Sequence, residues 1–148
     1  MQNEPTLRPA ALLVKPPIHP MLIPVPIVCF IGALATDIAY AVTAEMMWAD
    51  FSSWLLAVGF IGGVLAAIAG LIDFLGNRLI RQEAPAWPHL IGNLLVLAFL
   101  NNLIHTRDAY TSVVPTGLIL SVLTVLVMPV TIWLGREMVY RYGAGVVR

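Results

Sequence analysis

The stretch SSWLLAVGFIGGVLAAIAGLIDFLG, residues 52–76, decides the fold class, because its 25 residues include only one charged side chain, Asp73. An α-helix of about 20 apolar residues crosses the hydrocarbon layer of a bilayer, which is about 30 Å thick. A stretch of this length and composition therefore predicts a transmembrane helix.

Three further apolar stretches have the same character, at about residues 24–44, 88–105 and 113–135. The whole chain agrees, because 59% of its 148 residues are hydrophobic and only 11% are charged, whereas a soluble domain is about 25% charged. The connections are short, which makes consecutive helices antiparallel. We expect one all-α domain, an integral-membrane four-helix bundle with up-down-up-down topology. A proline-rich N-terminal arm (1–23) and a short C-terminal tail (136–148) flank it.

The basic residues predict the orientation of the bundle, since cytoplasmic loops of membrane proteins are rich in Lys and Arg. Arg107 falls alone on one side of the predicted helices. The other seven share the opposite side: Arg8, Lys15, Arg78, Arg81, Arg136, Arg141 and Arg148. We therefore expect both termini in the cytoplasm.

Small residues form a face on the second predicted helix. Two sets recur every four residues: Gly59, Gly63 and Ala67, and Gly62, Ala66 and Gly70. Small residues at this spacing let two helix backbones approach closely. We expect this face to pack inside the bundle, and a homodimer contact is the alternative.

Polar side chains inside the apolar stretches mark the candidate sites, because they are costly in a membrane and usually face the bundle interior or a wet cavity. Toward the cytoplasmic side lie His19, Asp73, His89 and Asn93. Toward the outer side lie Asp37, Asn101, Asn102, His105 and Arg107.

The cytoplasmic group offers ligands for a cofactor. His19 and His89 each lie where an apolar stretch begins, so they could ligate one haem iron or, together with Asp73, one metal ion. Asp73 lies near the C-terminal end of its helix, where the helix dipole disfavours a negative charge. It therefore needs a proton or a cationic partner.

The outer group contains the deepest charge, Asp37, which lies on the order of 10 Å from the outer end of its helix. A lone carboxylate there would take up a proton or pair with a cation. We expect Arg107 to be that partner, with Asn101 or Asn102 as hydrogen-bond donors.

Two alternatives apply to these polar groups. Met46 and Met47 also lie on the outer side, so that a His/Met-ligated haem with His105 is a further arrangement. In the structural alternative, the polar residues of both groups only cap helices or connect them by hydrogen bonds.

Several function classes are excluded by composition and motifs. Cys29 is the single cysteine, so there is no internal disulfide and no CxxC motif. The sequence has no Gly-rich phosphate loop, no GxSxG and no HExxH. Eight basic residues, most at the membrane boundary, do not form a nucleic-acid surface. We therefore expect neither a soluble-enzyme activity nor a nucleic-acid partner.

Five segments carry a family resemblance: HPMLIPVPIVCFIGALATDIAY (19–40), LLAVGFIGGVLAAIAGLIDF (55–74), AWPHLIGN (86–93), NNLIHTRDA (101–109) and WLGREMVYRYGAGV (133–146). Together they resemble a bacterial family of predicted membrane proteins of unknown function, over about residues 18–147. Arg136 departs from the family pattern, which commonly has a second glycine in a W-L-G-G-like motif.

The resemblance implies a location in the bacterial cytoplasmic (inner) membrane. It also implies a set of family positions: His19, Pro20, Pro26, Asp37, Gly70, Asp73, His89, Asn93 and Arg107. Relatives are often fused to, or encoded near, Rieske iron–sulfur or c-type cytochrome domains. This implies membrane electron transfer with haem b, and any such redox partner of this chain would be a separate protein.

The residues and the resemblance leave three functions open. The first is a haem b-binding or electron-transfer subunit with His19 and His89 as axial ligands. The second is a non-enzymatic accessory or scaffold subunit of a membrane complex. The third is a small proton or ion transporter that uses Asp37 and Asp73. The expected partners are the lipid bilayer and either a second copy of the chain or a larger redox complex.

Overall fold

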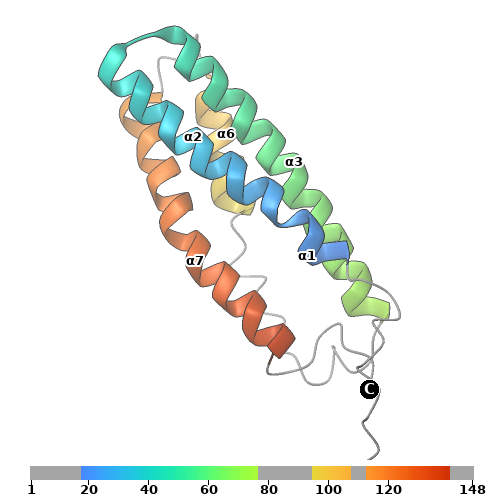
Figure 1. Cartoon of the computed structure of the whole chain (residues 1–148). Coiled ribbons are helices and arrows are strands. Elements are labelled where there is room, and N and C mark those ends of the chain that lie inside the picture. The colour runs from blue at the N-terminus through green and yellow to red at the C-terminus, as the bar shows by residue number, and fades with distance from the viewer. Residues whose placement is uncertain (1–17, 77–94, 108–112, 141–148) are drawn as a thin grey trace, which may run out of the picture.

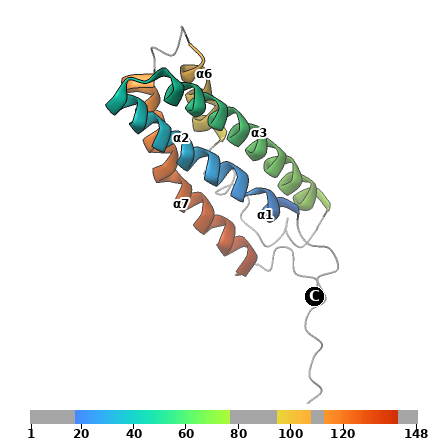
Figure 2. The ribbon, with the colours of Figure 1, turned by 45° about the horizontal axis from the view of Figure 1, so that its top comes forward.

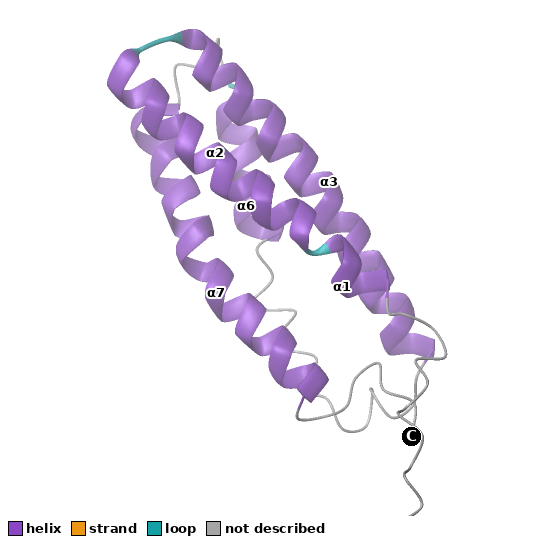
Figure 3. Cartoon of the chain, viewed as in Figure 1, coloured by secondary structure: helices purple, strands orange, loops and turns teal. Residues whose placement is uncertain are grey.

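The structure, a computed structural model, describes residues 18–76, 95–107 and 113–140, and the regular elements in those ranges are all helical (Figure 3). In chain order these elements are α1 (Ile18–Leu22), α2 (Pro24–Thr43), α3 (Met46–Gly76), α6 (Leu95–His105), the irregular helical turn η2 (Val113–Gly117) and α7 (Leu118–Tyr140). The all-α prediction is confirmed for this part of the chain. Figure 1 shows α2, α3 and α7 as long, roughly parallel rods.

Within the described residues, three helical stretches are long and apolar enough to cross a membrane: Ile18–Thr43 with 26 residues, Met46–Gly76 with 31 and Val113–Glu137 with 25. The fourth predicted stretch, 88–105, is described from Leu95 onward as an 11-residue helix, and its first part lies outside the described residues. Large apolar side chains face outward: Val28 is 68% exposed, Ile61 59% and Leu126 65%. Contact with lipid tails is favourable for such a surface, whereas contact with water is not.

The chain becomes helical earlier than the sequence predicts. The prolines predict an extended arm over residues 1–23, but α1 already begins at Ile18 and is followed directly by α2. His19 and Pro20 therefore lie in a helical turn, where a proline near the start removes no hydrogen bond. Pro24 and Pro26 occupy the first turn of α2 for the same reason.

A short turn joins α2 to α3. Thr43 ends α2, and Ala44 adopts a left-handed conformation with φ 56°. Its N–H donates to the carbonyl of Tyr40 at 2.8 Å, which satisfies a carbonyl at the helix end. Figures 1 and 2 show α2 and α3 side by side, and α3 begins at Met46, six residues before the predicted start at Ser52.

Glycines of α3 allow this close approach to α1 and α2. A Cβ atom at Gly59 would lie 2.7 Å from the ring of Phe30, and one at Gly62 would lie 2.8 Å from Val25. At Gly70 it would lie 3.0 Å from the ring of His19. The structure therefore places three of the four glycines singled out in the sequence against neighbouring helices of the same chain.

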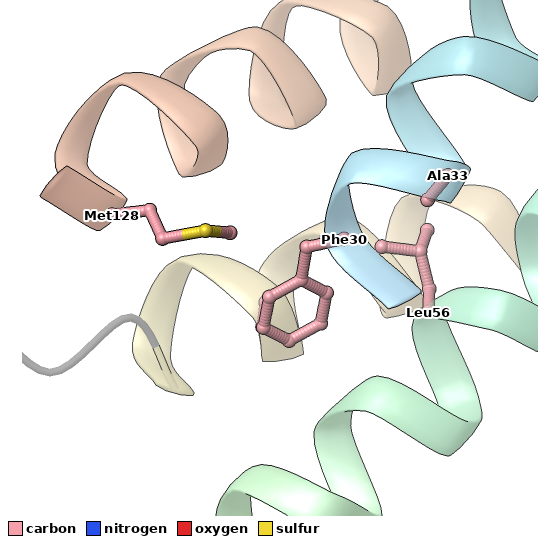
Figure 4. Close-up of a cluster of buried hydrophobic side chains, with 5 residues drawn as sticks. Phe30, Ala33, Leu56 and Met128 are labelled. Carbon is pink, nitrogen blue, oxygen red and sulfur yellow. The ribbon is translucent and has the colours of Figure 1, made fainter. Parts of the chain in front are cut away.

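A small apolar core lies between the helices. Its members are Phe30 and Ala33 of α2, Leu56 of α3, Ala98 of α6 and Met128 of α7. Figure 4 shows Phe30, Leu56 and Met128 converging from three helices. This apolar core joins α6 to the three long helices and supports the polar residues described next.

Candidate functional site

A cluster of buried polar side chains lies one helical turn from the apolar core. Within the described residues, the buried polar side chains are Asp37, Ser52, Asn101, His105, Ser121 and Thr124, each at most 1% exposed. They come from all four helices that form the apolar core. Asp37 follows Ala33 by four residues, and Ser52 precedes Leu56 by four, so each pair shares a helix face. We refer to these six residues as the polar cluster.

Asp37 lies at the centre of the polar cluster. The hydroxyl of Ser52 donates a short hydrogen bond to its Oδ1, and the hydroxyl of Ser121 donates to its Oδ2 at 2.5 Å. The Nε2 atom of His105 lies 2.9 Å from Oδ1. The side chains of Asp37 and His105 are both 0% exposed. Three side chains from three other helices thus converge on one carboxyl group.

The contacts of His105 fix the number of protons that the pair binds. Its Nδ1 lies 3.0 Å from the backbone oxygen of Asn101, and since a carbonyl can only accept, Nδ1 carries a hydrogen. A proton must then lie between Nε2 and Oδ1 of Asp37, because two lone pairs would repel at 2.9 Å. This proton can be assigned to His105, as imidazolium and carboxylate, or to Asp37, as imidazole and carboxylic acid. In both descriptions the pair shares one proton between Nε2 and Oδ1 and is neutral overall.

Asn101 and Gly117 support this arrangement from outside. The Nδ2 of Asn101 donates to the hydroxyl of Ser121 at 2.8 Å, while its Oδ1 is buried without a hydrogen-bond partner. Gly117 leaves space for the imidazole, because a Cβ atom there would lie 2.6 Å from Cε1 of His105. Gly117 ends η2, in which Val114 is non-helical with φ −116° and ψ 129°. The irregular first turn of the apolar stretch Val113–Glu137 therefore adjoins the histidine.

The predicted partner of Asp37 was wrong. Arg107 is exposed, and the side chain that contacts Asp37 is that of His105, with Nε2 2.9 Å from Oδ1. The arginine lies two residues past the last residue of α6, whereas His105 is still on the helix and faces α2. Asn102 is only half-buried, and of the two asparagines it is Asn101 that reaches the polar cluster.

The alternative of a His/Met-ligated haem at His105 is also contradicted. Both ring nitrogens of His105 are already engaged by hydrogen-bond partners, and iron needs an unprotonated nitrogen. Met46 and Met47 are 45% and 54% exposed, on the outside of the bundle.

The cytoplasmic group is only partly described. His19 of α1 lies against α3, with its Nδ1 2.6 Å from the carbonyl oxygen of Ala66. Asp73 is half-buried on the same helix, three residues beyond Gly70. His89 and Asn93 lie outside the described residues, so the predicted pair of His19 with His89 stays a prediction. The described ranges contain no group of three His, Cys, Asp or Glu side chains that could bind a metal ion.

Ser52, Ser121 and Thr124 are the members of the polar cluster that the sequence did not single out. The apolar pattern predicts Ser52 as the first residue of its helix, although α3 begins at Met46 and buries it. The available signal was helical spacing, because Ser121 and Thr124 lie seven and four residues before Met128 of the apolar core. Hydroxyl groups at such positions face the bundle interior.

A comparison with known families places this site in context. The model of a family described as a predicted membrane protein (DUF2231) matches residues 15–148. The chain belongs to this family. No protein of curated function and no solved structure is detectably similar to it. The DUF2231 match confirms the resemblance seen in the sequence and the membrane assignment, and its description assigns no activity, so the function is argued from the polar cluster.

Proposed function

We propose that this protein is a small proton transporter of the membrane, in which Asp37 and His105 together bind the transported proton. The observation that supports the proposal is the contact of 2.9 Å between two fully buried ionisable groups inside apolar helices. Asp37 lies six residues before the end of α2, which corresponds to a depth of about 9 Å along the helix. Ionisable groups at such positions usually mark an ion path or a proton relay.

A purely structural role explains the ionisable pair poorly. Hydrogen bonds between membrane helices stabilise by only about 0.6 kcal/mol on average, and serine and asparagine can supply them. Burying two ionisable groups costs several kcal/mol per ion before their attraction offsets it. Ser52, Ser121 and Asn101 already connect α3, α7 and α6 around Asp37. The property that Asp37 and His105 add is the ability to bind and release a proton.

The break at η2 suggests how the proton reaches the pair. Irregular backbone inside a membrane is tolerated where it is buried in protein or lines a wet cavity, and interrupted helices often form transport sites. Here the break directly contacts the imidazole through Gly117. Movement of this turn would expose His105 toward the end of the bundle that carries the α2–α3 turn.

Proton flux into liposomes tests the proposal. The purified full-length chain is reconstituted with a pH-sensitive dye inside, and a potassium gradient with valinomycin drives proton uptake. We expect flux above that of protein-free liposomes, loss of this flux in Asp37→Asn and His105→Gln, and retention in Arg107→Gln. Absence of flux in the unmodified protein, or equal flux in Asp37→Asn, would overturn the proposal and favour an accessory-subunit role.

The proposal includes a membrane setting. We propose a four-helix, up-down-up-down bundle in the bacterial inner membrane with both termini in the cytoplasm. The position of seven of the eight basic residues on one side supports this orientation. The outer side is then the end where α2 turns into α3, and the polar cluster lies in that half of the bundle.

A haem b site at His19 and His89 is the second candidate function, and one contact favours it. Nδ1 of His19 faces the carbonyl oxygen of Ala66 at 2.6 Å and so carries a hydrogen. In a neutral ring this makes Nε2 the unprotonated nitrogen, which is the tautomer found in ligating histidines. A reduced-minus-oxidised spectrum of protein from haem-replete cells tests it. We expect an α-band that His19→Ala abolishes, and its absence from the unmodified protein would refute the haem site.

A further inference from the structure

The amide oxygen of Asn101 points to a second ligand of the polar cluster. Asn101 is 0% exposed, and its Oδ1 is the only buried side-chain nitrogen or oxygen atom of the described residues that has no hydrogen-bond partner. Leaving a buried polar atom unsatisfied destabilises the folded protein, because the atom loses its hydrogen bonds to water. An atom of this kind inside a packed site indicates an occupant that the protein chain itself does not supply.

The neighbouring bonds show that this unsatisfied atom is an acceptor. Ser121 has one hydroxyl hydrogen, which it donates to Asp37 at 2.5 Å. Its oxygen can therefore only accept from Asn101, so the amide nitrogen must face it, at the observed 2.8 Å. Exchanging the amide nitrogen and oxygen would bring two acceptors together. The missing occupant is thus a cation or a hydrogen-bond donor.

The oxygen-bearing groups of the polar cluster favour a small cation. The carboxylate of Asp37 and the hydroxyls of Ser52 and Ser121 are linked by direct hydrogen bonds, and Asn101 adjoins them through Ser121. All of these groups offer hard oxygen ligands, which suit alkali and alkaline-earth ions better than transition metals. A single carboxylate provides one negative charge, and an uncompensated charge is costly in this apolar setting. The charge of the cluster therefore matches a monovalent ion.

We infer that the polar cluster binds a small alkali cation of the sodium class in exchange for the proton of the Asp37–His105 pair. This inference rests on the proposed function and names the ion that would be coupled to the proton. With the proton bound, the pair is neutral and Asn101 Oδ1 is unused. When the proton leaves, imidazole and carboxylate carry a net charge of −1, and one cation restores neutrality. One proton therefore leaves for each cation that binds.

Proton release on addition of salt tests the exchange. The purified full-length protein in weakly buffered detergent receives NaCl or, at equal ionic strength, choline chloride, and an indicator dye reports the protons released. We expect saturable release that approaches one proton per chain with NaCl and none with choline chloride. In Asp37→Asn the release disappears.

The variant Asn101→Leu keeps the branched shape of the side chain but removes the amide oxygen together with the Nδ2 donor to Ser121, and Asn102→Leu on the half-buried neighbour is its matched control. We expect Asn101→Leu to raise the NaCl concentration needed for half-maximal release about tenfold or more, which corresponds to about 1.4 kcal/mol, since the variant lacks the oxygen that would contact the ion. Asn102→Leu should behave as the unmodified protein. Asn101→Ser, which is smaller and keeps an oxygen, replaces Asn101→Leu if that variant does not fold, and it should show a smaller rise.

The outcomes separate this inference from the proposed function. If Asp37-dependent proton flux persists but NaCl releases no more protons than choline chloride, the occupant of Asn101 is water only, and the inference fails alone. If release occurs but is unchanged when Asn101 is replaced, the proposed position of the cation is wrong. If both flux and release are absent, the proposed function fails as well.

Discussion

At the scale of residues, the pair of Asp37 with His105 distinguishes this bundle from a set of packed apolar helices. Serine hydroxyls donate to the carboxylate, and Nδ1 of the imidazole donates to the backbone carbonyl of Asn101. One proton is then shared between Nε2 of His105 and Oδ1 of Asp37. Arg107 lies nearby in sequence but is exposed. Stability measurements can therefore separate the two candidate partners of Asp37.

A double-mutant cycle tests the pair energetically. We expect Asp37→Asn and His105→Gln each to lower the free energy of unfolding by about 3–5 kcal/mol, because each leaves the other group buried without its partner. The double variant should lose clearly less than the sum. Denaturant titration in detergent micelles gives these values. Arg107→Gln should change stability by less than about 0.5 kcal/mol, and additive losses for the pair would contradict the contact.

At the scale of elements, two glycine positions set how helices meet. On α3, Gly59 faces Phe30 and Cys29 of α2. The backbone of α3 therefore lies directly against side chains of α2. At the start of α7, Gly117 faces the ring of His105 on α6. The first contact sets the packing of the hairpin, and the second sets the geometry of the polar cluster.

Substitution at Gly59 should loosen the α2–α3 hairpin. A methyl group there would lie 2.7 Å from the Phe30 ring and 2.8 Å from Cys29, and overpacking of this kind costs about 1–3 kcal/mol. We expect Gly59→Ala to lower the thermal midpoint of the detergent-solubilised protein. Gly76→Ala is the control, because nothing lies within 4 Å of a Cβ atom at Gly76. Equal midpoints for both variants would argue against this packing.

Substitution at Gly117 should impair proton transport. Its added methyl group would lie 2.6 Å from Cε1 of His105, which must displace the imidazole from Asp37. We expect Gly117→Ala to reduce proton flux at least about tenfold, as small misplacements of reacting groups can. The same liposome assay measures it. Unchanged flux would show that the position of the His105 ring does not matter for transport.

At the scale of the whole molecule, the polar cluster and the apolar core form two successive layers across the bundle. The polar layer lies toward the α2–α3 turn, and the apolar layer of Phe30, Leu56 and Met128 lies below it. Outside both layers, large apolar side chains face away from the bundle. The two layers follow one another along the long helices, so the proposed transport depends on which end of the bundle faces the cytoplasm.

Reporter fusions test the orientation. We expect a fluorescent protein fused after Arg148 to fluoresce in bacterial cells, and alkaline phosphatase at the same position to be inactive, because both outcomes require the C-terminus to be cytoplasmic. Alkaline phosphatase inserted after Glu45, in the α2–α3 turn, is the matched fusion and should be active. The reverse pattern would place the polar cluster on the cytoplasmic side.

The sequence predicted the properties that depend on a single segment. The apolar lengths around residues 24–44 and 52–76 were sufficient to predict membrane helices, and the first-turn prolines Pro24 and Pro26 marked the start of α2. The depth of Asp37 also followed from its own helix. These predictions succeed because length, hydropathy and proline position act locally.

The partner of Asp37 could not be predicted in the same way. His105 lies 68 residues away, and its contact depends on how far α6 is rotated and shifted against α2. Arg107 was the predicted partner because of its positive charge, but the rotation of α6 places His105 against Asp37 instead. Ser52 was predicted at the start of its helix because the apolar stretch begins there, whereas α3 continues back through the exposed Asp50 to Met46.

The layering of the bundle also has an electrical consequence. Asp37 lies about 9 Å along α2 from the α2–α3 turn, which is about a third of a hydrocarbon layer of roughly 30 Å. A full membrane voltage is worth about 2.3 kcal/mol per charge for each 100 mV. A proton that reaches the pair from the α2–α3 side would then cross about a third of this voltage, and passage beyond Phe30 would carry most of the remaining voltage dependence.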